Sequence, residues 1–313
     1  MSSNELKVPK SLKLSVVIVV YRMARQAANT LRSFSTDYQQ SIAASDYEII
    51  IVENRSDDML GEETAISLGS NIRYFLHENE GSSPVAALLF GIEQARASSL
   101  CLVIDGARMV TPRVLQYALT AFRIDPNAVV AVPGYHLGAA EQHRNPSHTA
   151  ESEQELLDRA DWASDGYRLF EISVFFRGRH QNGYLLPLME SNCVFFSRGT
   201  YDAIGGVDLS FDMPGGGMVN LDLYKRLVEQ PSTQLFVLAG EGTFHQFHGG
   251  VTTKMDGSRE ELLASFRDQY QEVRGESYDM PRATPRILGA VPGWAMPPLQ
   301  YSASAVIRGL LPK

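Results

Sequence analysis

Short apolar runs alternate with helix-forming segments along the first part of the chain, and this alternation restricts the possible folds more than any other feature. LSVVIVVY (14–21), YEIIIVEN (47–54) and LCLVID (100–105) are apolar almost throughout, which is typical of strands buried on both faces. The segments between them, such as 80–98, are helix-forming and Ala-rich. The alternation predicts an α/β fold with a mostly parallel central sheet and helices on both faces.

The composition excludes several classes of function. The chain has 313 residues and a formal net charge of -8, which argues against a nucleic-acid-binding surface. It contains no apolar run near the roughly 20 residues that a transmembrane helix needs. The start, MSSNELKVPKSLK, lacks the apolar core of a signal peptide. We therefore expect a cytoplasmic enzyme without nucleic-acid partners.

Polar or small residues stand where three of the predicted strands end. Because ligands bind beyond the carboxyl ends of parallel strands, we expect these residues to converge on one crevice. They are Tyr21, Glu53, Asn54, Ser56 and Asp105.

The order of motifs resembles the family-two nucleotide-sugar glycosyltransferases of GT-A fold over about residues 14–250. The matching pieces are LSVVIVVY, YEIIIVENRSDD, ENEGSSPVAALLFGIEQA, LVIDGARM and AIGGVD. The resemblance implies a nucleotide-sugar-binding half (1–135) and an acceptor-side half with a lid-like excursion (136–255). A helical and proline-rich tail (256–313) follows, which we expect to dock on the fold or to form a homo-oligomer.

The resemblance also implies a nucleoside diphosphate sugar as donor. The backbone near Val20 and Tyr21, together with Glu53, would hold the base and ribose, and Asn54, Asp105 and Gly106 would complete the pocket. A second interpretation is that Glu53, Asn54 and Ser56 only cap the next helix or form a turn.

The metal site implied by the family is altered in this sequence. Relatives carry Asp-x-Asp, but here the motif reads Asp105, Gly106, Ala107. Relatives also place a His from a later strand end on the metal, and His245 and His248 stand there. Together with Asp105 they predict a site for Mn²⁺ or Mg²⁺, of which imidazole favours Mn²⁺. Alternatively, Arg108 or a His neutralises the diphosphate without metal.

The catalytic base is altered too. Relatives carry an acidic pair at the start of a late helix, where this chain has Val219 and Asn220. The remaining candidates are Glu190 and Asp222, and a third possibility is that no conventional base exists.

Two functions follow from these motifs. The first is an inverting glycosyltransferase that acts on a saccharide or other small-molecule acceptor. The second is a glycosyltransferase-like binding or scaffold protein without turnover, which the loss of acids at Ala107 and Asn220 favours.

Overall fold

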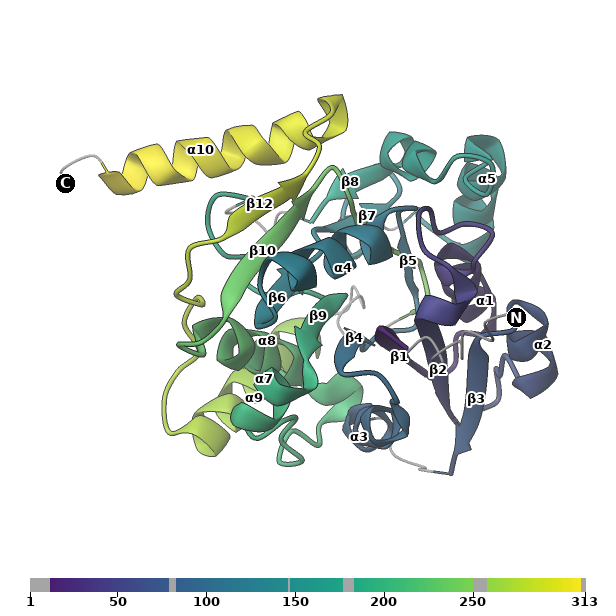
Figure 1. The fold of residues 1–313 in the computed structure, drawn as a ribbon, viewed down its shortest axis with the longest axis horizontal. Coiled ribbons are helices and arrows are strands. Elements are labelled where there is room, and N and C mark those ends of the chain that lie inside the picture. Colours follow the sequence, from purple (N-terminus) through teal and green to yellow (C-terminus); the bar gives the residue numbers. More distant parts are fainter. Residues whose placement is uncertain (1–11, 79–82, 146, 177–182, 250–257, 311–313) are drawn as a thin grey trace, which may run out of the picture.

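An eight-stranded sheet in the order β12-β10-β6-β9-β4-β1-β2-β3 forms the centre of the molecule (Figure 1). The computed structural model describes residues 12–78, 83–145, 147–176, 183–249 and 258–310. The strands are β1 (Leu14–Val20), β2 (Tyr47–Asn54), β3 (Ile72–His77), β4 (Ser99–Val103), β6 (Ala128–Ala131), β9 (Val194–Ser197), β10 (Gln234–Ala239) and β12 (Arg286–Gly289). Within the described ranges only β9 is antiparallel to its neighbours, β4 and β6. The predicted mostly parallel sheet is confirmed.

Helices cover both faces of this sheet, as predicted. Because side chains alternate along a strand, Val17 and Val19 of β1 face one layer and Val16 and Ile18 face the other. The first layer contains α3 (Val85–Gln94), α7 (Arg198–Ala203), α8 (Val219–Glu229) and α9 (Ser258–Arg274). The second contains α1 (Ala24–Phe34), α2 (Glu62–Ser67) and α4 (Val114–Ile124).

A second sheet of four short strands was not predicted from the sequence. Its order is β5-β11-β7-β8, from β5 (Arg108–Val110), β11 (Thr243–His245), β7 (Gly134–Leu137) and β8 (Ser173–Phe175). The polar excursion does contain its expected helix, α5 (Ala150–Ala160), but β7 and β8 flank it. The expected boundary between residues 135 and 136 falls inside β7. Strands of three or four residues are too short for periodicity to reveal.

The C-terminal region is more closely joined to the fold than the sequence indicated. The strand β12 pairs with β10 at the edge of the large sheet, and α10 (Met296–Leu310) follows it. Ser302 on α10 accepts a hydrogen bond from the backbone of Leu185 at 2.7 Å, so the helix is docked at that point. Among the described residues, no helix combines the length and apolar character needed to span a bilayer.

Gly106 packs against the end of β1, which leads to a stability prediction. A Cβ at this position would lie 2.9 Å from the backbone oxygen of Val19 and 2.9 Å from a methyl group of Val20. We expect Gly106→Ala to lower the free energy of unfolding by about 1–3 kcal/mol, measured by urea denaturation. Gly199→Ala is the control, because a Cβ there meets only Ser197 Oγ at 3.8 Å. Equal stability of Gly106→Ala and the parent would contradict the prediction.

Candidate active site

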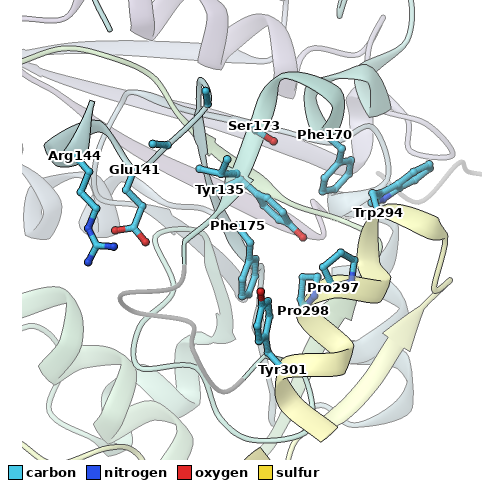
Figure 2. Close-up of a pocket in the computed structure, with 13 residues that line it drawn as sticks. Tyr135, Glu141, Arg144, Phe170, Ser173, Phe175, Trp294, Pro297, Pro298 and Tyr301 are labelled. Carbon is cyan, nitrogen blue, oxygen red and sulfur yellow. The ribbon is translucent and has the colours of Figure 1, made fainter. Parts of the chain in front are cut away.

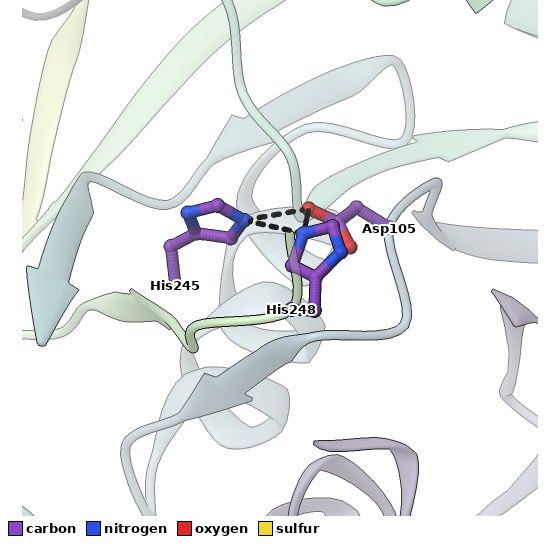
Figure 3. A group of neighbouring side chains, drawn as sticks. All are labelled: Asp105, His245 and His248. Atoms are coloured by element: carbon purple, nitrogen blue, oxygen red, sulfur yellow. Dashed lines mark hydrogen bonds and ion pairs between the residues drawn. The ribbon is translucent and has the colours of Figure 1, made fainter. Parts of the chain in front are cut away.

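Asp105, His245 and His248 converge at the carboxyl end of β4 (Figure 3). Asp105 follows β4, whereas His245 ends β11 and His248 lies three residues beyond it. His245 Nε2 lies 3.2 Å and His248 Nε2 lies 3.7 Å from Asp105 Oδ2, and the two imidazole nitrogens are 2.9 Å apart. One ligand atom from each residue lies within 4.8 Å of the others. The three residues predicted as metal ligands are therefore neighbours in space.

The electrostatics of this cluster suit a divalent cation. Burial opposes ionisation of Asp105, but the imidazoles of His248 and His245 outweigh it and hold the pKa of the carboxyl well below its usual range. Burial, together with the Arg108 guanidinium, lowers the pKa of His245 to about 3. Near neutral pH, the site thus offers a carboxylate and an uncharged imidazole, which are the protonation states that metal binding requires.

Arg108 and His136 extend the cluster across the small sheet. The ladder pairs His245 with Arg108 on β5 and with His136 on β7, so the three side chains share one face. Arg108 Nε lies 3.3 Å from Asp105 Oδ2, and its Nε and Nη1 are buried without a hydrogen-bond partner among the described residues. His136 Nδ1 lies 3.4 Å from His245 Nδ1. His136 was not identified from the sequence, because a strand of four residues is too short to show a periodic pattern.

A buried carboxylate on α5 holds the segment between His245 and His248 in place. Glu153 on α5 is fully buried and accepts a hydrogen bond from the backbone N–H of Phe247 at 2.7 Å. The same carboxylate pairs with Arg25 at 3.0 Å and with His148 Nε2 at 3.1 Å. The amide of Gln26 also donates to the Phe247 carbonyl. These contacts fix the backbone between His245 and His248.

We expect Glu153→Gln to weaken metal binding although Glu153 is not itself a ligand. An amide accepts fewer hydrogen bonds than a carboxylate and cannot pair with Arg25, so the histidine segment loses its fixed position. Residues that orient metal ligands contribute about 10- to 100-fold in affinity. The dissociation constant for Mn²⁺, measured by calorimetry, should rise by that factor. Glu155→Gln, on the same helix, is the control, and equal effects of the two substitutions would refute this role.

The residues predicted to bind the nucleotide lie where their strands end, but most are buried. Val20 and Glu53 are neighbours in the β1–β2 ladder and are fully buried. The Glu53 carboxylate accepts from the backbone N–H groups of Leu60 and Gly61 and from the Tyr74 hydroxyl, at 2.8 to 3.0 Å. In this structure Glu53 therefore holds the loop after β2, which is the turn-forming role considered as the second interpretation.

Asn54, Gly106 and Tyr21 differ in how they face the solvent. Asn54 is 1% exposed, and its Oδ1 lies 3.1 Å from His77 Nδ1 on β3. Gly106 is buried against β1, as described above. Tyr21 and Asp105 are the two members of the predicted set with partly exposed side chains. Only these two side chains are therefore open to a ligand without rearrangement.

Glu190 lies at the same end of the sheet as Asp105. The ladder pairs Val194 of β9 with Leu102 of β4, so the residues that precede Val194 lie beside the end of β4. The side-chain amide of Asn220 donates to Glu190 Oε2 at 3.0 Å and to Asn192 Oδ1 at 3.1 Å. Asn220, which replaces an acid of the family motif, therefore holds an acid supplied by a different segment.

Asp222 occupies a different environment. It is 1% exposed, and its two oxygens accept hydrogen bonds from Arg226 and Arg274 at 2.6 to 2.9 Å. A carboxylate held by two guanidinium groups connects α8 to α9 and is poorly placed to take a proton from a substrate. The geometry therefore favours Glu190 over Asp222 as the base.

A separate cavity of about 500 Å³ lies between β7, β8 and the C-terminal segment (Figure 2). Its aromatic lining includes Tyr135, Phe170, Phe175, Trp294 and Tyr301, and Glu141 and Arg144 stand on the opposite wall. Tyr135 is adjacent to His136 on β7, so their side chains point to opposite faces of the small sheet. The aromatic side of the cavity is therefore separated from the Asp105 cluster by that sheet.

Comparison with known proteins agrees with this architecture. The model of the Glycosyl transferase family 2 matches residues 15–204. The chain therefore belongs to glycosyl transferase family 2, which confirms the resemblance seen in the motifs. A search of the curated proteins finds no significant match.

Solved structures with the same fold include TarS from S. aureus. The crystal structure of TarS 1–349 is 11% identical and has a TM-score of 0.50, covering 84% of this chain and 73% of that one. The same TarS region in complex with UDP-GlcNAc also is 11% identical, with a TM-score of 0.50, and covers 83% of this chain and 67% of that one. These similarities support the GT-A-like fold.

Proposed function

We propose that the protein transfers a sugar from a nucleoside diphosphate sugar to a saccharide or other small-molecule acceptor, with inversion. The observation that carries this proposal is the convergence of Asp105, His245 and His248 at the strand ends (Figure 3). In a doubly wound sheet this edge is where ligands bind. A protein that served only as a scaffold would have no need for a buried cluster of one carboxylate and two imidazoles.

The three residues fit a resident divalent cation. Two imidazole nitrogens and one carboxylate oxygen form a donor set better suited to Mn²⁺ than to Mg²⁺, which prefers oxygen ligands. When bound, the cation supplies Lewis-acid stabilisation of the charge that develops on the diphosphate leaving group.

The protein's own residues supply the remaining functions. The buried guanidinium of Arg108 forms an ion pair with Asp105, and its Nε and Nη1 have no hydrogen-bond partner among the described residues, so it can stabilise negative charge on the diphosphate. Glu190 accepts the proton of the attacking acceptor hydroxyl, and Asn220 holds its carboxylate in position. The hydroxyl oxygen forms a bond to the anomeric carbon as the bond to the diphosphate oxygen breaks. A single displacement of this kind inverts the anomeric configuration.

The second candidate is a binding protein without turnover, and Ala107 is the observation that favours it. Ala107 stands at the position of the second family Asp, and its side chain has no carboxylate. It is also fully buried. The two candidates differ in one respect: both bind a nucleotide, but only the enzyme consumes the sugar donor.

Titration with UDP and GDP, each with Mn²⁺, with Mg²⁺ and with chelator, tests the proposal. We expect one nucleotide to bind with Mn²⁺ and to bind more weakly with chelator. UDP-GlcNAc, the donor in the TarS complex, is the first sugar nucleotide to test for release of UDP. Binding without any donor consumption across a panel of sugar nucleotides and acceptors would support the binding protein. A lack of binding to both UDP and GDP would refute the transferase and favour a scaffold that keeps only the fold.

A further inference from the structure

The C-terminal segment 280–313 differs in charge from the rest of the chain. All 36 acidic residues precede residue 280, although the formal net charge of the whole chain is -8. The segment itself contains four basic residues, which are Arg282, Arg286, Arg308 and Lys313. Arg286 and Arg308 are exposed, whereas Arg282 pairs with Asp279 at 3.1 Å. A cationic segment therefore lies at the end of an acidic protein.

Exposed apolar side chains are concentrated in the same segment. Ten large apolar side chains of the described residues are exposed, and six of them lie between residues 287 and 307. Ile287, Val291, Trp294, Met296, Tyr301 and Ile307 make up this set. Figure 1 shows α10 at the outer edge of the molecule, with its C-terminal end extending beyond the rest of the fold. This group forms an apolar surface around α10.

The outer face of α10 combines exposed apolar side chains with one basic residue and uncharged polar ones. Its exposed residues recur at helical spacing and include Met296, Tyr301, Ile307 and Arg308, with Gln300 and Ser304 between them. The opposite face holds the helix to the fold through Pro298 and Ser302, which lie against Gly183. Helices of this kind bury apolar and aromatic side chains at the headgroup level, while basic residues contact anionic lipids.

We propose that α10 and the exposed side of β12 dock the protein on an anionic lipid surface. A second copy of the chain is the competing occupant, but a symmetric interface would bring one cationic segment against another. Anionic headgroups instead complement the basic charge, and each basic residue near such a surface contributes about 1 kcal/mol, or about fivefold in partitioning.

The border of this surface lies near Trp294. The indole N–H donates to the carbonyl of Gly240 at 3.2 Å, and its ring stacks on Phe170. Asp165 and Glu171 line the surface beside the ring, together with Arg168. These acids limit the contact on that side, so the bilayer contacts α10 and β12 but not the region around α5.

Vesicle co-sedimentation of the full chain tests the proposal. The probes are vesicles of phosphatidylcholine alone and vesicles with about one third phosphatidylglycerol. We expect the partition coefficient to be at least about tenfold higher for the anionic vesicles and to fall as salt is raised. Arg286→Gln with Arg308→Gln should lower it about thirtyfold, because two basic residues are removed. Met296→Ser with Ile307→Ser should also reduce binding.

Matched controls lie elsewhere on the surface. Ile124→Ser and Leu209→Ser remove exposed apolar side chains outside the segment and should leave partitioning unchanged. Thermal denaturation checks that the variants fold. The absence of vesicle binding by the parent chain, or equal effects of the control and segment variants, would overturn the proposal. A dimer in solution that Ile307→Ser dissociates, without vesicle binding, would assign the surface to a second copy instead.

Discussion

Replacement of His245 by Ala is expected to remove metal-dependent nucleotide binding. His245 is 4% exposed and supplies one of three ligand atoms, so the variant leaves Asp105 and His248 as the remaining protein ligands. Residues that merely orient metal ligands contribute 10- to 100-fold, so loss of a ligand should raise the dissociation constant for Mn²⁺ by more than about 100-fold. Turnover should fall by about 1000-fold, since Lewis-acid stabilisation is worth several kcal/mol. Calorimetry and UDP release measure the two effects.

Because His245 is buried, the loss of Mn²⁺ binding in His245→Ala must be distinguished from a loss of folding. His248→Ala provides the second variant, since the His248 side chain is 13% exposed and less tightly packed. His143→Ala removes an imidazole outside the cluster and should leave Mn²⁺ affinity unchanged. If the His245 and His248 variants both remain folded and bind Mn²⁺ as the parent does, the cluster does not hold the metal.

Glu190→Gln is expected to slow transfer strongly while leaving donor binding intact. The substitution keeps the shape of the side chain but removes its ability to accept a proton. General-base catalysis contributes about 10²- to 10⁴-fold, so kcat should fall by about that factor. The dissociation constant of the nucleotide should stay within about twofold of the parent value, because Glu190 is held by Asn220 and is not one of the three residues of the Asp105 cluster.

Comparison of Asp222→Asn with Glu190→Gln separates an effect on catalysis from an effect on stability. Removing one charge from a buried ion pair costs about 3–5 kcal/mol, so this variant should unfold at a lower urea concentration than Glu190→Gln. The opposite pattern, with stable and inactive Asp222→Asn beside fully active Glu190→Gln, would transfer the role of base to Asp222.

The large sheet was predictable because each strand carries its own signal. Residues 14–20 and 47–54 each have a β-branched apolar centre and are buried along their whole length, which is typical of a strand covered on both faces. The small sheet was missed because its strands have three or four residues and belong to segments far apart in the chain. Pairing of β5 with β11 joins residues about 135 positions apart, and local periodicity carries no information about such contacts.

The residues that form the candidate site could be predicted from the sequence, but the hydrogen-bond partners of the selected acids could not. Asp105, His245 and His248 were selected as strand-end residues, and the ladder does bring them together. Glu53 was selected on the same grounds, and Asp222 as an acid close to the altered acidic pair of the family. Hydrogen bonds from Leu60, Gly61 and Tyr74 occupy the carboxylate of Glu53, and hydrogen bonds from two arginines occupy that of Asp222. A sequence shows that an acid is present but not which buried donors surround it.

The guanidinium beside Asp105 has a consequence for the order in which ligands bind. Arg108 Nε lies 3.3 Å from the single carboxylate, so the positive charge of Arg108 offsets the attraction that Asp105 offers to a free cation. The same positive charge attracts a diphosphate. Metal and nucleotide should therefore favour each other's binding, and thermodynamic linkage requires that each raise the affinity of the other by the same factor. This site has one carboxylate, from Asp105, and one guanidinium, from Arg108, where the family motif has two carboxylates. We therefore expect the cation to bind together with the nucleotide and to dissociate when the product leaves.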